Sequence, residues 1–356
     1  MRIRSILSEA WRNTISGTSR ALLLTLILGV VAGALAWLDL STARGLVERA
    51  QEFQKSGASI AVVEAPGRID GVACESLNQI PTVRAAGAIR VADRLTLPVL
   101  PDQQLPTHDV TTGFPEILGI TVQGSGVVLP ETLAETLGAS VGEPLQLGSA
   151  TTTVAGIYAY PDDGRKAGYS YTALAPVPSS GSNFDECWVD AWPPTSQLRG
   201  LLSATAITVD PTKDEPTTIG QLNTRLGATF DGPGQFRSRI TVWAPVAALL
   251  AGIAVGYGSI RTRRLELSAA QHAGVSGSAQ LLQLLLESMV WAIAAGILTI
   301  PVLVLAANGL AWADARPLAA LGALSPLGAV LGSLAGTALG AARIRERDLF
   351  KHFKDR

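Results

Sequence analysis

Four long apolar runs constrain this 356-residue chain more than any other feature, because each is long enough to cross the hydrocarbon core of a bilayer as a helix. With 47% hydrophobic and only 16% charged residues, the chain is too apolar for an ordinary soluble protein of this length. We therefore expect an α-helical membrane protein. Its transmembrane helices are predicted at residues 21–40, 239–260, 279–310 and 317–342.

Positive charge collects at the ends of these runs and predicts the topology. Basic residues precede the first run and follow the second and fourth, whereas Arg316 in the turn between the third and fourth is balanced by Asp314. Short basic loops stay in the cytosol. We expect a plasma (inner) membrane protein with both termini cytosolic, a cytosolic tail at 343–356, and residues 41–238 outside. The first run is longer than a typical signal-peptide core and no small-residue cleavage site follows it, so we expect a retained helix.

The charged segment between the second and third runs is predicted to form a short cytosolic helix within 261–278. Three arginines follow the second run directly, and nothing between residues 263 and 273 breaks a helix. Gly274 suits a left-handed C-terminal cap, and Ser276 or Ser278 could cap the next helix. An ordinary positive-inside loop without a binding role is the alternative interpretation.

Before the first run, residues 1–20 are predicted to contain an amphipathic helix on the inner membrane surface. Apolar side chains recur there at helical spacing, and charged side chains lie elsewhere on the helical wheel. A short disordered basic leader is the alternative. The predicted apolar face consists of Ile3, Ile6, Leu7, Ala10 and Trp11.

Between the first and second runs, the chain is predicted to form a stalk and then a mixed α/β domain. A helical stripe continues the first span through 41–57, and the domain occupies 58–238. Apolar periodicity and β-branched residues distinguish the expected strands from the expected helices. Strands are expected at 59–64, within 83–100, at 184–191 and at 204–209, with a helix at 70–80 and a strand-helix-strand order in 126–158.

Two stretches resemble permease subunits of FtsX-like and MacB-like ABC systems. In the first, Arg264, Glu266 and Gly274 match a basic-acidic helix followed by an alanine-glycine-small step, and Glu287 matches a glutamate in the following helix. That stretch, at 261–287, is RTRRLELSAAQHAGVSGSAQLLQLLLE. The second, at 126–158, is similar to the external domain of MacB-like permeases, although a generic small α/β module is the alternative. The tail departs from the proline-containing ending usual in the family.

This resemblance implies a permease of a type VII ABC transporter with a MacB-like periplasmic core domain of two subdomains. The smaller subdomain, at about 105–180, would be inserted into the larger. The permease would act as a homodimer, or as a heterodimer with a paralogue, and would bind a separate ABC ATP-binding subunit carrying ATP and Mg. The implied ATPase-coupling residues are Arg261, Arg263, Arg264, Glu266 and Gly274.

Two functions fit this architecture. One is export, or efflux, of a peptide, lipid or drug-like molecule, and the other is mechanotransmission that activates an envelope or extracellular partner protein. A membrane-anchored sensor or scaffold without an ATPase is a rival from another class, but it gives the basic helix no role. An external enzyme is a weaker rival, because no site supports it.

Glycines spaced four residues apart predict close packing between helices, either within the chain or between two copies. Small residues remove side chains from one face of a helix and let two backbones approach. This spacing is common in membrane helices, so a homodimer is implied mainly by the resemblance. The candidate packing residues are Gly29, Gly33, Gly252, Gly256, Gly328, Gly332, Gly336 and Gly340.

The only two cysteines, Cys74 and Cys187, both lie in the region predicted outside. An oxidising compartment and an even count favour a disulfide, with two buried thiols as the alternative. In the loop-entropy model such a bond would stabilise the fold by about 4 kcal/mol.

Candidate chemistry is sparse. The three histidines are far apart in sequence, the pair Asp162-Asp163 sits in a glycine-bearing turn, and the sequence lacks a P-loop pattern. We expect no metal site, no catalytic site and no cofactor on this chain, and the net charge of −1 argues against nucleic-acid binding.

Glu287 is the one ionisable residue inside the third run, where it either anchors the helix at the interface or pairs with a basic group, or carries protons or substrate. Membrane lipids are expected partners of the spans.

Overall fold

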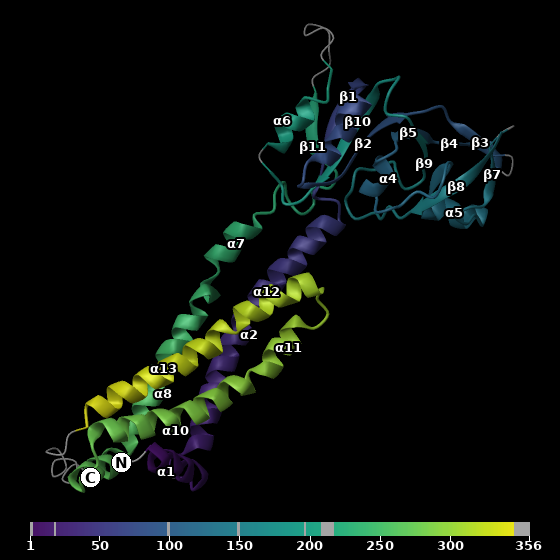
Figure 1. The fold of residues 1–356 in the computed structure, drawn as a ribbon. Helices are drawn as coiled ribbons and strands as arrows, with labels where there is room; N and C mark the ends of the chain where they lie inside the picture. Colours follow the sequence, from purple (N-terminus) through teal and green to yellow (C-terminus); the bar gives the residue numbers. More distant parts are fainter. Residues whose placement is uncertain are drawn as a thin grey trace. The chain divides into compact units, whose positions relative to one another are not determined.

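The computed structural model describes residues 3–17, 19–97, 100–147, 150–195, 197–207 and 217–344. The chain divides into two compact units (Figure 1). We call Met1–Glu48 with Asp231–Arg356 the membrane unit, and Arg49–Phe230 the external unit. Almost all of the predicted tail at 343–356 lies outside the described residues.

The membrane unit is helical. Four stretches are long and apolar enough to cross a membrane, namely Ala21–Lys55, Ile240–Thr262, Gly277–Ala307 and Trp312–Ala342. They overlap the four predicted spans, with shifted ends. The elements are α1 (Ile3–Ile15), α2 (Ala21–Lys55, which continues into the external unit), α7 (Gly232–Ser238), η2 (Ile240–Trp243), α8 (Ala244–Thr262), α9 (Arg264–His272), α10 (Gly277–Leu298), α11 (Ile300–Ala307), α12 (Trp312–Gly322) and α13 (Leu324–Ala342).

Three of the spans differ from the single helices predicted for them: one is longer, and two are divided by a break. The first span and the predicted stalk form one helix, α2, of 35 residues. The third span is divided at Thr299, because Pro301 in the first turn of α11 cannot donate a backbone hydrogen bond to the preceding helix. The fourth begins at Trp312, five residues before the predicted start, and is divided at Ala323 into α12 and α13.

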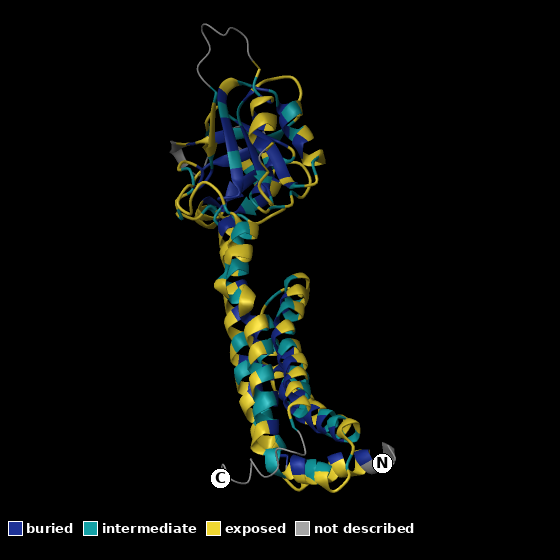
Figure 2. Cartoon of the chain, turned by 90° about the vertical axis from the view of Figure 1, so that its left-hand side faces the viewer, coloured by how far each residue is buried: buried dark blue, intermediate teal, exposed yellow. Residues whose placement is uncertain are grey.

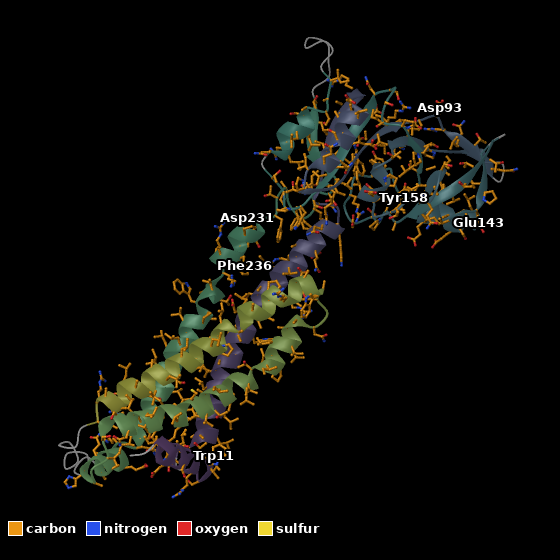
Figure 3. All side chains as sticks on the ribbon, viewed as in Figure 1. Trp11, Asp93, Glu143, Tyr158, Asp231 and Phe236 are labelled. Carbon is orange, nitrogen blue, oxygen red and sulfur yellow. A yellow bond between two sulfur atoms is a disulfide. The ribbon has the colours of Figure 1, made fainter. Side chains whose placement is uncertain are left out.

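Many residues of the membrane unit are exposed (Figure 2), and large apolar residues are among them. Soluble proteins rarely leave an extended apolar surface in water, so these faces suit contact with lipid tails. The helix α1 likewise exposes part of its apolar surface: Ile6 and Ala10 are buried, while Trp11 is exposed (labelled in Figure 3). Large side chains on the spans that are 60–76% exposed include Leu22, Val30, Leu250, Val304 and Leu331.

α8 and α13 pack backbone against backbone through their glycines. A Cβ added to Gly256 would lie 2.1 Å from the carbonyl oxygen of Ser333, and one added to Gly332 would lie 2.0 Å from that of Leu249. Gly252, Gly328, Gly336 and Gly340 also lie in this contact. The two spans therefore pack within one chain. Gly29 and Gly33 of α2 instead face side chains of α10 and α11.

The external unit is built on a mixed nine-stranded sheet with short helices and a separate two-stranded ribbon, β3 with β4 (Figure 1). Its helices are α3 (Gly71–Ser76), η1 (Leu77–Gln79), α4 (Phe114–Ile117), α5 (Glu131–Leu137) and α6 (Leu198–Ser203). Its strands are β1 (Ile60–Ile69), β2 (Val83–Val91), β3 (Leu95–Leu97), β4 (Leu100–Leu105), β5 (Thr107–Thr111), β6 (Val127–Pro130), β7 (Pro144–Leu147), β8 (Ala150–Tyr158), β9 (Ala173–Val177), β10 (Phe184–Ala191) and β11 (Thr218–Gln221).

The strand order of the large sheet is β11-β1-β10-β2-β5-β9-β6-β8-β7. The chain segment from β5 to β9 thus supplies five adjacent strands at one end, and the segments before and after it supply the other four. One sheet thus runs through the predicted smaller subdomain at 105–180 and the rest of the external unit. Tyr158 (Figure 3) is buried there, with its hydroxyl 2.6 Å from the carbonyl oxygen of Tyr169.

A disulfide joins Cys74 of α3 to Cys187 of β10, the pairing that the sequence favours. Glu75, the next residue, accepts hydrogen bonds at 3.0 Å from the Thr112 hydroxyl and the Gly113 backbone N–H. Burial alone raises the pKa of Glu75, but these hydrogen bonds, together with those from the Ser179 and Thr111 side chains, outweigh burial and lower it. Both features fix the position of α3 on the sheet.

The strand predicted at 204–209 is wrong where the structure describes it. Thr205 lies in a turn, and Ala206 forms only an isolated bridge to Ile69. The strand that completes this edge of the sheet is β11, which pairs with β1. Residues 208 and 209 lie outside the described residues.

Candidate coupling site

The α9 helix packs on the end of the membrane helices through its buried face. Leu267 is 5% exposed and packs with Ile260 of α8 and Leu284 of α10. The Gln280 side chain of α10 donates a 2.8 Å hydrogen bond to the carbonyl oxygen of Leu267 and accepts a 2.7 Å bond from Gln271. α9 is therefore fixed to α10 by both apolar and polar contacts.

Arg263, which immediately precedes α9, forms the centre of a partly buried ionic network. Its Nη1 donates to Oε2 of Glu287 at 2.6 Å, and its Nη2 and Nε donate to Glu266 at 2.9 and 3.1 Å. The second carboxylate oxygen of Glu287 accepts from Asn13 at 2.8 Å and from Gln283 at 3.1 Å. Both oxygens of this carboxylate thus have donors, and the network joins α1, α9 and α10.

This geometry gives Glu287 a pairing role. The carboxylate is 2% exposed and has Arg263 as its basic partner, which offsets the cost of burying a charge near the membrane. Burial alone would lower the pKa of Arg263, but the hydrogen bonds and negative charges of Glu266 and Glu287 raise it. The guanidinium therefore stays charged across the physiological range.

The other predicted coupling residues lie apart from this network. Arg261 is exposed, and Arg264 is half-buried on a different side of α9. Gly274 follows α9 with a φ of +94°, in the left-handed region that its predicted capping role requires. The Glu266 side chain remains 50% exposed, and Ala269 is exposed beside it. These side chains give α9 an outward face that none of the described residues covers.

The sequence patterns did not predict Asn13 or the three glutamines of this site, Gln271, Gln280 and Gln283. Asn13 is 274 residues from Glu287, and its place on an amphipathic helix carries no signal for a specific partner. Gln271 and Gln280 are ordinary helix-forming residues in the sequence. Only the packing of α1 and α9 on α10 makes them neighbours.

A second buried ion pair lies in the membrane unit, between α2 and the start of the second span. Asp39 is 1% exposed, and its carboxylate accepts from Arg239 at 2.9 Å. Thr42 and Thr241 share a 2.8 Å hydrogen bond close by. Arg44 donates to the carbonyl oxygen of Ala306 at the end of α11. These contacts tie α2 to two other helices.

One charged cluster of the external unit consists of Lys166, Glu64 and Glu186. Lys166 lies 2.6 Å from Glu64 and 2.7 Å from Glu186, and Glu186 also accepts a 2.8 Å hydrogen bond from Trp188. Burial lowers the pKa of Lys166, but the two glutamates outweigh it and raise the pKa overall. Among the described residues, no group of His, Cys, Asp and Glu could hold a metal ion.

No protein-family model and no curated protein matches the chain. Among solved structures, it is similar to the periplasmic region of MacB from Actinobacillus actinomycetemcomitans, at 10% identity and a TM-score of 0.34, covering 46% of this chain and 89% of that chain. A domain of a putative permease protein from Porphyromonas gingivalis matches at 13% identity and a TM-score of 0.32, covering 52% and 98%. The extracellular domain of the ABC-type transporter YknZ from Gram-positive bacteria matches at 12% identity and a TM-score of 0.30, covering 46% and 99%.

These solved structures are a periplasmic region, a permease domain and an extracellular domain, matched at low identity and over about half of this chain.

Proposed function

We propose that this chain is the membrane subunit of an ABC complex, which converts ATP hydrolysis by a partner subunit into movement of the external unit. Both termini and α9 would lie in the cytosol. ATP and Mg would be bound by the partner subunit. A second permease copy, identical or paralogous, would complete the complex.

The observation that carries this proposal is the mounting of α9. Its inner face is held by the buried Arg263–Glu287 pair and by Gln280, while its outer face presents Glu266 and Ala269. A force applied to the outer face would pass to α10, because the buried ion pair and the close packing make α9 and α10 move together. An ordinary loop between spans needs no such attachment.

The continuous α2 supports a mechanical output. No break separates its membrane-length segment from the residues that enter the external unit, so movement of one end would be carried to the other. We propose that the movement drives export of a peptide, lipid or drug-like molecule already in the outer compartment or membrane. Mechanotransmission to an envelope partner is the second candidate, and the same continuous helix favours it.

Purification of the tagged chain from its native membrane in mild detergent tests the proposal, with mass spectrometry of all copurifying proteins. We expect an ATP-binding subunit in near-equal amount. A stoichiometric envelope protein would favour mechanotransmission or a multi-component exporter. If the chain came alone under several gentle conditions, the proposal would fail and a sensor or scaffold would take its place.

Two variants test the contact itself. Glu266→Lys should weaken ATPase association, but it also removes a partner of Arg263. Ala269→Arg changes the exposed face of α9 but leaves the Arg263 network intact. Loss of ATPase association in both variants would therefore show that the exposed face makes the contact. Glu131→Lys makes the same charge change on exposed α5 of the external unit and should retain the ATPase. Unchanged ATPase association in both α9 variants would show that the ATPase does not bind this face of α9.

A further inference from the structure

We propose that a hollow lined by three arginines, where α8 and α13 end, binds the phosphate group of an anionic phospholipid. Its volume is about 280 Å³, just below the range of pockets for drug-sized ligands and suited to a headgroup. The lining includes Tyr257, Ile260 and Ile344 beside the arginines. The arginines are Arg261, Arg264 and Arg343.

Within the part of the chain that the structure describes, no negative charge compensates the arginines of this hollow. No carboxylate is among its lining residues, and among the described residues neither Arg261 nor Arg264 forms an ion pair. Arg263, their direct neighbour, instead contacts two carboxylates. Three guanidinium groups around one space repel each other unless an anion lies between them, and phosphate oxygens match guanidinium donors.

One arginine is held in place for such a role. Arg343 donates a 3.0 Å hydrogen bond to the hydroxyl of Tyr257, and its guanidinium carbon lies 5.5 Å from the centroid of that ring. These contacts orient the guanidinium while using few of its donors. The remaining N–H groups are available to an anion.

The position of the hollow favours a lipid over a soluble anion. The two spans that form it end at Thr262 and Ala342, so the arginines stand where the membrane segments meet water. Leu339, one residue before the lining residue Gly340, is 55% exposed and continues the lipid-facing surface. A phosphate among the arginines would let acyl chains follow that surface, and basic pockets between spans on the cytoplasmic side suit anionic headgroups.

Native mass spectrometry of the full chain tests this inference, after reconstitution in nanodiscs of mixed phosphatidylcholine and phosphatidylglycerol without any ATPase. We expect bound phosphatidylglycerol to survive detergent release. Arg261→Gln should weaken its retention about fivefold and Arg261→Gln with Arg343→Gln about thirtyfold. Arg316→Gln, an exposed arginine at the far end of the fourth span, is the matched control and should retain the lipid.

Three results would overturn the inference. Equal retention of phosphatidylglycerol by the wild type and both hollow variants would show that the hollow does not bind this lipid. Inorganic phosphate that stabilises the wild type in phosphatidylcholine-only nanodiscs, but not the double variant, would assign the hollow to a free anion. Normal lipid retention with lost ATPase copurification would assign it to a partner's carboxylates. Because the lipid assay contains no ATPase, its outcome is independent of the proposed function.

Discussion

Replacing Gly256 with alanine should push α8 away from α13, whereas the same replacement at Gly258 should not. A Cβ at Gly256 would lie 2.1 Å from the Ser333 carbonyl oxygen, while one at Gly258 would meet no atom within 4 Å. The shortest ordinary contact is 3.4 Å, so the two backbones would have to part by about 1.3 Å. Neither backbone can rotate away as a side chain could.

The comparison isolates the cost of this separation. Both variants gain the same intrinsic helix preference of alanine over glycine, up to about 1 kcal/mol, and the gain cancels in the difference. Overpacking of this kind costs typically about 1–3 kcal/mol. We expect Gly256→Ala to be less stable than Gly258→Ala by that amount.

Unfolding of the full chain in mixed detergent micelles measures the difference. Increasing SDS is added and helix content is followed by circular dichroism, with the wild type and both variants in parallel. Gly29→Ala is a further comparison, since its Cβ would lie 3.2 Å from a flexible Leu298 side-chain atom and should cost less. Equal midpoints for the Gly256 and Gly258 variants would refute backbone contact between α8 and α13.

Three other perturbations have defined outcomes. Replacing Cys74 and Cys187 with alanine should destabilise the external unit by about 5 kcal/mol, the value that the loop-entropy model gives for their separation of 113 residues, and alkylation of both thiols without reduction, seen by mass spectrometry, would contradict the bond. Glu287→Ala should cost about 3 kcal/mol in the same SDS assay, because Arg263 loses its buried partner but keeps Glu266; an unchanged midpoint would deny the pair a structural role. The pKa of Glu75 is lowered from 4.5 on folding, so its ionised form stabilises the external unit above pH 4.5 and this contribution disappears as the pH falls through the lower folded value. Glu75→Gln should therefore lower the thermal midpoint at pH 7 and lose this effect in acid, and a pH-independent difference would count against the assignment.

Features that depend on local sequence were predictable. The four apolar runs, the capped helix before Gly274 and the strand β10 each carry their own periodicity or breaker residues. The breaks at Thr299 and Ala323 are marked by nearby prolines, but hydropathy alone merges the segments on either side. Local patterns thus identify elements better than they identify element ends.

Features that depend on distant neighbours were not predictable. The spacing of Gly252 and Gly256 indicates close approach, but only the packing shows that their partner is α13 of the same chain. Glu287 is recognisable as a buried charge, yet its contact with Asn13 depends on how α1 docks. The segment 204–209 looks like a strand, but of its described residues only Ala206 bridges to β1, at Ile69, and β11 pairs with β1 farther along, at residues 61–64.

The length of α2 means that a small tilt of this helix moves its far end by a large distance. At about 1.5 Å per residue its 35 residues extend about 52 Å, whereas the hydrocarbon core is about 30 Å thick. A tilt of about 5° pivoted at Ala21 would carry Lys55 sideways by about 5 Å over that length. A partner that shifts the helix base by a small angle would therefore produce, at the other end, a displacement as large as one helical turn.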